Sequence, residues 1–78
     1  MYRILICDDD ADIVSALKIY LSGENYELLT VSNGREAVEL VSETPVHLIL
    51  MDVMMPELDG IAATARIREV CNVPIILL

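Results

Sequence analysis

Residues 47–52 read HLILMD, a continuous apolar run that ends in an aspartate. Residues 3–8 repeat this pattern as RILICD, and two further short apolar runs are ELLTV at 27–31 and VPIILL at 73–78. Runs of this length, apolar at consecutive positions, are typical of strands that are covered on both faces of a parallel sheet. The sequence therefore predicts four parallel strands, over residues 3–7, 27–31, 47–51 and 73–78.

Three longer stretches between these strands have helical spacing. The first ends at Ser22-Gly23, the second begins at Asn33 as an N-cap with Glu36 three residues on and stops at Thr44-Pro45, and Asp59 caps the third. The predicted apolar stripes are Ile13, Val14, Leu17, Tyr20 and Leu21 in the first helix, Ala37, Val38, Leu40 and Val41 in the second, and Ile61, Ala62, Ala65 and Val70 in the third. Strands that alternate with helices indicate an α/β fold with right-handed crossovers.

Composition narrows the class of protein. The chain has 78 residues, of which 55% are hydrophobic, so it forms one small domain at most, or a piece of a larger one, and not a disordered acidic tail. Thirteen acidic and five basic residues give a net charge of -8, which argues against binding nucleic acid or an anionic membrane through its own charge. No apolar run approaches the roughly 18 residues of a membrane span. The start of the chain has no secretory signal, and Cys7 and Cys71 have the apolar neighbours of buried thiols, so we expect a cytoplasmic protein.

Carboxylates follow two of the predicted strands directly. The first strand ends in Asp8-Asp9-Asp10, and the third ends in Asp52. If these strands are neighbours, at least three carboxylates meet at one edge of the sheet and repel one another unless a cation lies among them. Oxygen ligands with open positions suit Mg²⁺, and a carboxylate beside Mg²⁺ can attack phosphorus to form an acyl phosphate. The spacing therefore predicts an acidic metal site with one candidate nucleophile.

Two segments carry a specific resemblance. ILICDDD at 4–10 and LILMDVMMPELDG at 48–60 resemble the two signature regions of response-regulator receiver domains of two-component systems. In the second, an aspartate that ends a strand is followed three positions later by Met-Pro, and Asp-Gly comes three beyond that. The resemblance covers the whole chain and implies a flavodoxin-like, doubly wound parallel sheet with strand order 2-1-3-4. It also implies a signalling module, not an enzyme, phosphorylated by a sensor histidine kinase with Mg²⁺.

The resemblance assigns roles residue by residue. Asp52 matches the phospho-accepting aspartate. Asp9 matches the direct ligand of Mg²⁺, and Asp8 matches an acidic residue that acts chiefly through water. Met54 matches the position whose backbone carbonyl completes the metal site. The positions that shape the loop over the pocket are Pro56 and Gly60.

Finer details resemble the branch of the family in which a winged-helix DNA-binding domain follows the receiver domain. This implies that DNA would be bound only by that downstream domain, which residues 1–78 do not include. The family places a Ser or Thr after the fourth strand and a Lys after the fifth, and Leu78 precedes both positions. Lys18, the only lysine, lies in the first predicted helix. We therefore expect residues 1–78 to be a partial receiver domain without the fifth strand and last two helices. Poor stabilisation of a phosphoryl group and homo-oligomers through the exposed fourth strand would follow.

Other interpretations of the same residues stay open. The pattern Asp8-x-Asp10 after an apolar strand also resembles haloacid-dehalogenase-type phosphatases, in which the first Asp is the nucleophile and the second the acid/base. That family expects Thr or Val two residues later, where this chain has Asp12. A third alternative is an inactive truncated receiver that serves as an assembly unit. Asp10 and Asp12 also suit the positive N-terminus of the first helix, and His47 suits a structural role.

Overall fold

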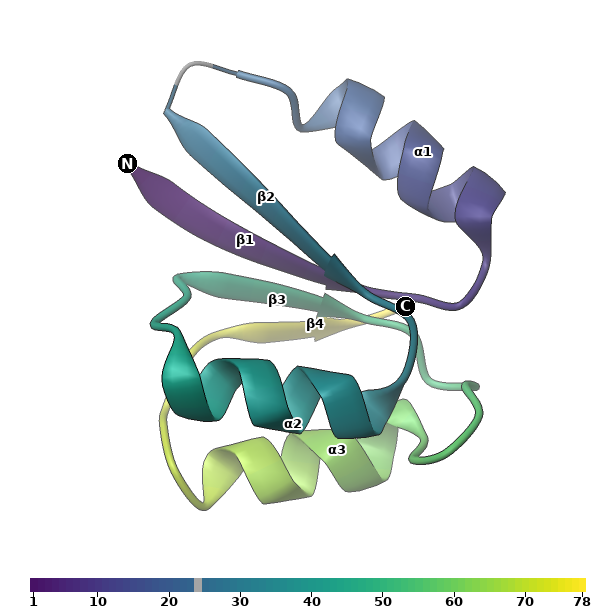
Figure 1. Cartoon of the computed structure of the whole chain (residues 1–78), viewed down its shortest axis with the longest axis vertical. Helices are drawn as coiled ribbons and strands as arrows, with labels where there is room; N and C mark the ends of the chain where they lie inside the picture. The colour runs from purple at the N-terminus through teal and green to yellow at the C-terminus, as the bar shows by residue number, and fades with distance from the viewer. Residues whose placement is uncertain (24) are drawn as a thin grey trace.

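The computed structural model describes residues 1–23 and 25–78, which form strands and helices in strict alternation (Figure 1). In chain order the elements are β1 (Tyr2–Cys7), α1 (Ala11–Tyr20), β2 (Tyr26–Val31), α2 (Gly34–Glu43), β3 (Leu48–Met51), α3 (Gly60–Arg68) and β4 (Ile75–Leu77). Every strand pairing is parallel, and the order across the sheet is β2-β1-β3-β4. The predicted α/β architecture and strand order are therefore confirmed.

Two strands are shorter than their apolar runs. β4 contains only Ile75–Leu77, because Pro74 has no N–H to donate to a ladder and contributes only its carbonyl, which accepts from the Ile49 amide at 2.9 Å. His47 lies just before β3, and its Nδ1 accepts a hydrogen bond of 2.9 Å from the Arg3 amide. The His47 ring also meets Tyr2 edge to face, with 5.3 Å between ring centroids. This confirms the structural role predicted for His47.

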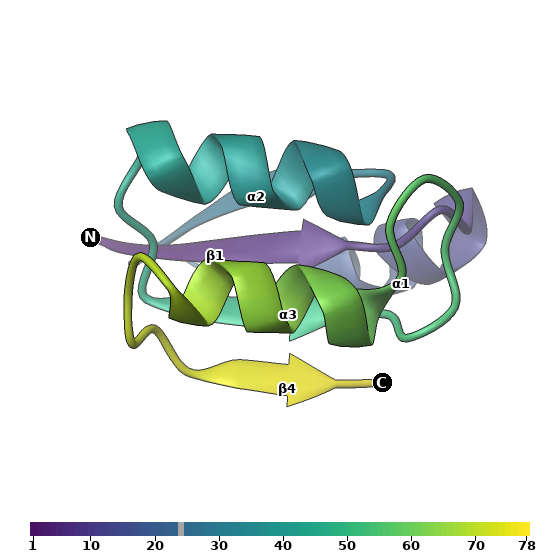
Figure 2. The same cartoon turned by 90° about the horizontal axis from the view of Figure 1, so that it is seen from below.

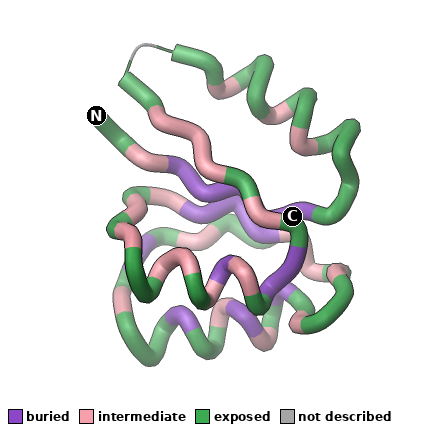
Figure 3. The backbone as a smooth tube through the Cα atoms, in the orientation of Figure 1, coloured by how far each residue is buried: buried purple, intermediate pink, exposed green. Residues whose placement is uncertain are grey.

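The helices lie on the two faces of the sheet. α2 and α3 lie side by side on one face, and α1 lies on the other (Figure 2). Because successive side chains of a strand point to opposite faces, Leu5 and Cys7 of β1 belong to the core under α2 and α3, whereas Ile4 and Ile6 face α1. Most residues of β1 and β3 are buried, whereas α1 contains no buried residue (Figure 3).

The predicted helix starts are confirmed by their capping hydrogen bonds. Asp10 accepts from the amides of Asp12 and Ile13, at 2.9 and 3.3 Å. Asn33 accepts from the Glu36 amide at 2.9 Å, and Asp59 accepts from the Ala62 amide at 2.8 Å. The C-cap of α2 is Thr44, as the Thr44-Pro45 pair predicts. No helix in the described residues is long and apolar enough to cross a membrane.

The predicted buried faces of α1 and α3 are partly wrong. Of the residues predicted for the third helix, Ile61 is 62% exposed, and Val70, which lies after the end of α3, is 61% exposed, whereas Ala63 and Ile67 are fully buried. The reason is the contact with α2, where a Cβ on Gly34 would lie 3.0 Å from the Ala63 Cβ, so the helices approach through their smallest side chains. In α1, Val14, Leu17 and Leu21 pack on the sheet, but Ile13 and Tyr20 are exposed. Cys7 is buried as predicted, and Cys71 is only half-buried.

We expect Gly60→Ala to destabilise the fold and Gly23→Ala to leave it nearly unchanged. A Cβ on Gly60 would lie 2.1 Å from the Asp52 carbonyl oxygen, a backbone atom that cannot move without shifting the end of β3. A Cβ on Gly23 would meet only the Tyr26 ring, at 3.5 Å. Overpacking of this kind costs about 1–3 kcal/mol, against less than about 1 kcal/mol for the control. Urea denaturation measures both, and equal stabilities of the two variants would contradict the close approach.

Candidate functional site

Three aspartates meet at the carboxyl edge of the sheet. Asp8 and Asp9 follow β1 and Asp52 follows β3, and these strands are hydrogen-bonded neighbours. One carboxylate oxygen from each aspartate lies within 4.8 Å of the others. The amide of Asp52 donates to the Cys7 carbonyl at 2.9 Å, so the sheet ladder continues into the site itself. The structure thus brings together the three carboxylates that the sequence predicts as metal ligands.

The three carboxylates differ in exposure. Asp8 is buried, with 5% of its surface exposed, whereas Asp52 is half-buried and Asp9 is exposed. Burial raises the pKa of Asp8, and the nearby carboxylates of Asp52 and Asp9 raise it further. The hydrogen bond from the Asp10 amide to Asp8 Oδ1, at 2.9 Å, acts in the opposite direction. The negative charges of the three carboxylates are therefore only partly offset by hydrogen bonds from the protein.

Cys7 lies directly beneath this cluster. Burial and then the negative charges of Asp8 and Asp52 raise the pKa of the Cys7 thiol to about 12, so it stays protonated at neutral pH. Its Sγ lies 3.3 Å from the Asn33 carbonyl and 3.4 Å from the Met55 sulfur. This environment fits the predicted inert, buried thiol and offers no reactive thiolate.

No salt bridge among the described residues reaches Asp8, Asp9 or Asp52, and the three that occur join arginines to glutamates elsewhere. Lys18 lines a separate hollow between α1 and β2 that also includes Asp8 and Asp9, and its side chain is exposed. Clustered carboxylates without a protein cation favour either proton uptake or a bound metal ion. The oxygen-only donor set and the exposed side of the cluster fit Mg²⁺, which keeps several of its waters.

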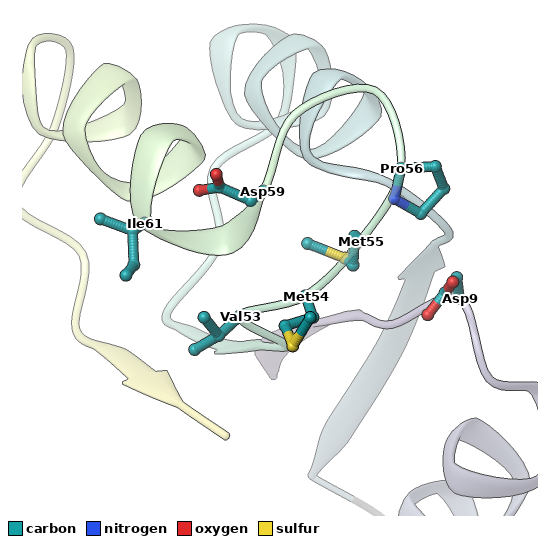
Figure 4. A pocket seen from close by; sticks show the side chains of 7 residues that line it. All are labelled: Asp9, Val53, Met54, Met55, Pro56, Asp59 and Ile61. Carbon is teal, nitrogen blue, oxygen red and sulfur yellow. The ribbon is translucent and has the colours of Figure 1, made fainter.

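The loop after β3 forms the other wall of the site. Together with Asp9 it encloses an open pocket of about 440 Å³, lined by Asp9, Val53, Met54, Met55, Pro56, Asp59 and Ile61 (Figure 4). The Met54 amide lies 3.4 Å from Asp52 Oδ1, and the Met54 side chain is 82% exposed. The Gly60 amide donates to the Val53 carbonyl at 2.9 Å and closes the loop. A mostly apolar wall therefore lies beside the acidic edge.

Two residues at this loop have contacts that the sequence did not predict. Asn33 was expected only as a helix cap, but its Nδ2 also donates to Glu57 Oε2 at 3.0 Å. Glu57 has a φ of 64°, in the left-handed region that non-glycine residues seldom adopt. A local hydrogen bond from the Leu58 amide to the Pro56 carbonyl, at 2.9 Å, closes a γ-turn around Glu57, and the contact with Asn33, 24 positions away along the chain, adds to it. Asp10 lies outside the carboxylate cluster, since its side chain caps α1.

Comparisons with known proteins agree with this geometry. The family model of the response regulator receiver domain matches residues 4–78. The transcriptional regulatory protein SrrA of Staphylococcus aureus is 47% identical over 76 residues, which are 97% of this chain and 32% of that protein. This chain therefore spans about a third of the length of that relative.

Two solved structures show the same fold. The receiver domain of the sensor histidine kinase PA1611 from Pseudomonas aeruginosa PAO1, with a magnesium ion coordinated in the active site cleft, is 33% identical with a TM-score of 0.91, over 97% of this chain and 65% of that one. A chain from the complex of histidine kinase ThkA with response regulator protein TrrA is 36% identical with a TM-score of 0.89, over 99% of this chain and 67% of that one. With the strand order and the family match, these similarities show that the chain belongs to the response-regulator receiver domain family.

Proposed function

We propose that this chain is a phosphoryl-accepting signalling module in which Asp52 takes the phosphoryl group from a partner sensor histidine kinase. The observation that carries the proposal is the convergence of Asp8, Asp9 and Asp52 within 4.8 Å at two neighbouring strand ends. Mg²⁺ would be held by these three carboxylates and the backbone carbonyl of Met54, and it would offset their charge and that of the phosphoryl group. The kinase complex of a similar chain supports a partner of this class.

Exposure explains why Asp52 is the acceptor and not Asp8. Asp52 is half-buried, and its Oδ1 lies 3.4 Å from the Met54 amide, whereas Asp8 is buried and accepts a hydrogen bond from the Asp10 amide. An oxygen of the Asp52 carboxylate would form the new bond to phosphorus while the bond from phosphorus to the donor's nitrogen breaks. The donor keeps that electron pair, so the transfer needs no oxidant or reductant.

The output of the signal is the second part of the proposal. Because SrrA is named as a transcriptional regulatory protein, we propose that phosphorylation here regulates transcription through a DNA-binding domain outside these residues. The net charge of -8 makes the receiver itself a poor ligand for DNA, so the receiver would act on that domain and not on DNA. We place this signalling in the cytoplasm, where the partner kinase and DNA would both be reached.

The alternative phosphatase has weaker support. It needs Asp10 as an acid/base beside a nucleophilic Asp8, but Asp10 Oδ1 already accepts from the Asp12 and Ile13 amides. It also leaves Asp52 without a role, although Asp52 lies in the cluster and Asp10 does not. An inactive assembly unit would need no acidic cluster at all.

We expect acetyl phosphate with Mg²⁺ to label Asp52, and peptide mass spectrometry locates the label. The label should stay well below one per chain, since an acyl phosphate adds up to about two negative charges beside two carboxylates. Asp52→Asn should abolish labelling, whereas Asp12→Asn, an equal charge change on exposed α1, should not. Label on Asp8 would favour the phosphatase, and no label on a folded chain would favour the assembly unit.

We expect Asp8→Asn to stabilise the metal-free protein at neutral pH. Because burial raises the pKa of Asp8, the folded state binds its proton more tightly than the unfolded state, so folding stability falls as pH rises from the ordinary range of an aspartate through the raised pKa. The amide variant removes this loss and keeps an acceptor for the Asp10 amide.

With saturating Mg²⁺ the parent should become more stable than Asp8→Asn, since only the parent has the full set of carboxylates that binds the ion. Urea denaturation in EDTA and in Mg²⁺, near pH 5 and pH 7, measures both effects. A variant that is less stable than the parent in EDTA at pH 7 would contradict the raised pKa.

We also propose that the 78-residue chain self-associates through β4. Ile76, Leu77 and Leu78 are 49%, 46% and 54% exposed, and β4 lies at the end of the strand order. Glu69 is the only charged side chain among residues 69–78, so most of the net charge of -8 lies elsewhere and opposes contact at this edge only weakly. A second copy fits best, because two such apolar edges are complementary to each other.

Sedimentation at micromolar concentration is expected to show dimers or larger species. Ile76→Lys should shift the chain to monomer, because a charge would then be buried at the edge contact. Ile61→Lys, at an apolar side chain of comparable exposure on α3, is the matched control and should leave association unchanged. A parent chain that stays monomeric would rule out this edge as a contact between copies.

A further inference from the structure

The loop over the acidic site is joined to the start of α2 by direct contacts. The Gly34 amide donates to the Leu58 carbonyl at 3.1 Å, and a Cβ on Gly34 would lie 2.1 Å from that oxygen. Beside this contact, Asn33 Nδ2 donates to Glu57 Oε2 at 3.0 Å. The two segments therefore meet through backbone and side chain together, with no space for a larger residue at position 34.

Asn33 contacts both segments that carry the aspartates. Its side chain reaches the loop after β3 through Glu57, and its carbonyl accepts from the thiol of Cys7, the residue directly before Asp8. Only 7% of the Asn33 surface is exposed, and its Oδ1 caps α2 by accepting from the Glu36 amide. One buried amide side chain thus links a helix start to the metal-site loop.

Glu57 explains why this link matters for the loop. Its left-handed backbone, with a φ of 64°, is unfavourable for a residue with a Cβ and persists only where surrounding contacts maintain it. The ion pair with Arg35 is long, at 3.9 Å, and both side chains are more than half exposed, so it contributes little. The Leu58 amide donates to the Pro56 carbonyl at 2.9 Å and closes the turn at Glu57, but this bond lies within the loop. The hydrogen bond from buried Asn33 is shorter than the Arg35 ion pair and joins this turn to α2, and Glu57 lies three positions after Met54.

We propose that Asn33 is a positioning residue for the metal site: its hydrogen bond to Glu57 holds the loop 53–59 in the conformation that presents the Met54 carbonyl to the ion. The inference rests on the proposed function, because it concerns the same Mg²⁺ site. Residues that orient metal ligands from behind typically change metal affinity by about 10–100-fold when they are replaced. It also means that metal binding and the start of α2 influence each other.

The test separates capping from positioning. The Asn33 Nδ2 also donates to Glu36 Oε1, at 3.2 Å, within the cap of α2. Asn33→Asp keeps an oxygen to cap α2 but replaces the donor with a negative charge facing both Glu57 and Glu36, and we expect Mg²⁺ to bind about tenfold more weakly. Added negative charge alone would strengthen binding, so the direction of the change distinguishes the two effects. In the double variant N33D/E57Q the amide of the new side chain can donate in the reverse direction, and the net charge equals that of the parent. Its affinity should return to within about threefold of the parent.

Mg²⁺ titration monitored by backbone amide NMR shifts of Asp9 and Met54 gives these affinities. Glu57→Ala leaves the cap of α2 intact and tests the same hydrogen bond if N33D does not fold, with the same expected weakening. Glu39→Gln, a charge change on the exposed face of α2, is the control for long-range electrostatics. Parent-like or tighter binding by N33D and E57A, or no recovery in the double variant, would overturn the inference.

Amide hydrogen exchange in the metal-free protein separates this inference from the proposed function. The amides of Met54, Met55, Glu57 and Leu58 should exchange faster in N33D than in the parent and recover in N33D/E57Q. If the parent bound no Mg²⁺, the proposed function would fail, and exchange alone would decide whether Asn33 holds the loop. Unchanged exchange in N33D would show that it does not.

Discussion

The repulsion among three carboxylates at two neighbouring strand ends is the constraint on which the rest of this structure depends. Asp8 and Asp9 cannot separate from Asp52, because β1 and β3 are paired in parallel register up to Cys7 and Met51, immediately before the acidic residues. Both strands are buried on both faces, so hydrophobic burial holds the charged edge together. A site of this kind costs stability and can persist only on a rigid sheet, which is why the acidic residues follow the most buried strands and not β2 or β4.

The same constraint explains why the aspartates at this edge differ in exposure and in hydrogen bonding. Asp8 is buried, which raises its pKa, and its hydrogen bond from the Asp10 amide fixes the carboxylate in place. Asp9 is exposed to solvent, and Asp52 is half-buried. In the proposed site, the exposed Asp9 would bind the metal ion directly, and the buried Asp8 would act chiefly through one of the waters that Mg²⁺ keeps. Asp10, one residue further on, has already left the cluster to cap α1.

Much of this arrangement could be predicted from the sequence, because it depends on local patterns. Continuous apolar runs gave the strands, and side-chain caps at Asn33 and Asp59 gave the helix starts. The buried face of α3 could not be predicted, because its short apolar residues form two competing stripes and the approach to Gly34 selects Ala63 over Ile61. The contact between Asn33 and Glu57 was also missed, since both residues have ordinary local roles and meet only in the folded chain.

The loop after β3 shows how a receiver can keep its site while its surface varies. Close approach fixes both ends of the loop, with Gly60 against the Asp52 carbonyl and Gly34 against the Leu58 carbonyl. Between these points the contacts that shape the loop come from backbone atoms and from the buried Asn33, whereas the Met54 side chain is 82% exposed. In the proposed metal site the ligand at position 54 is a backbone carbonyl, so changes of the Met54 side chain would alter the wall of the pocket without removing that ligand. Glycine at positions 34 and 60 therefore constrains the site more tightly than the identity of the exposed residue beside it.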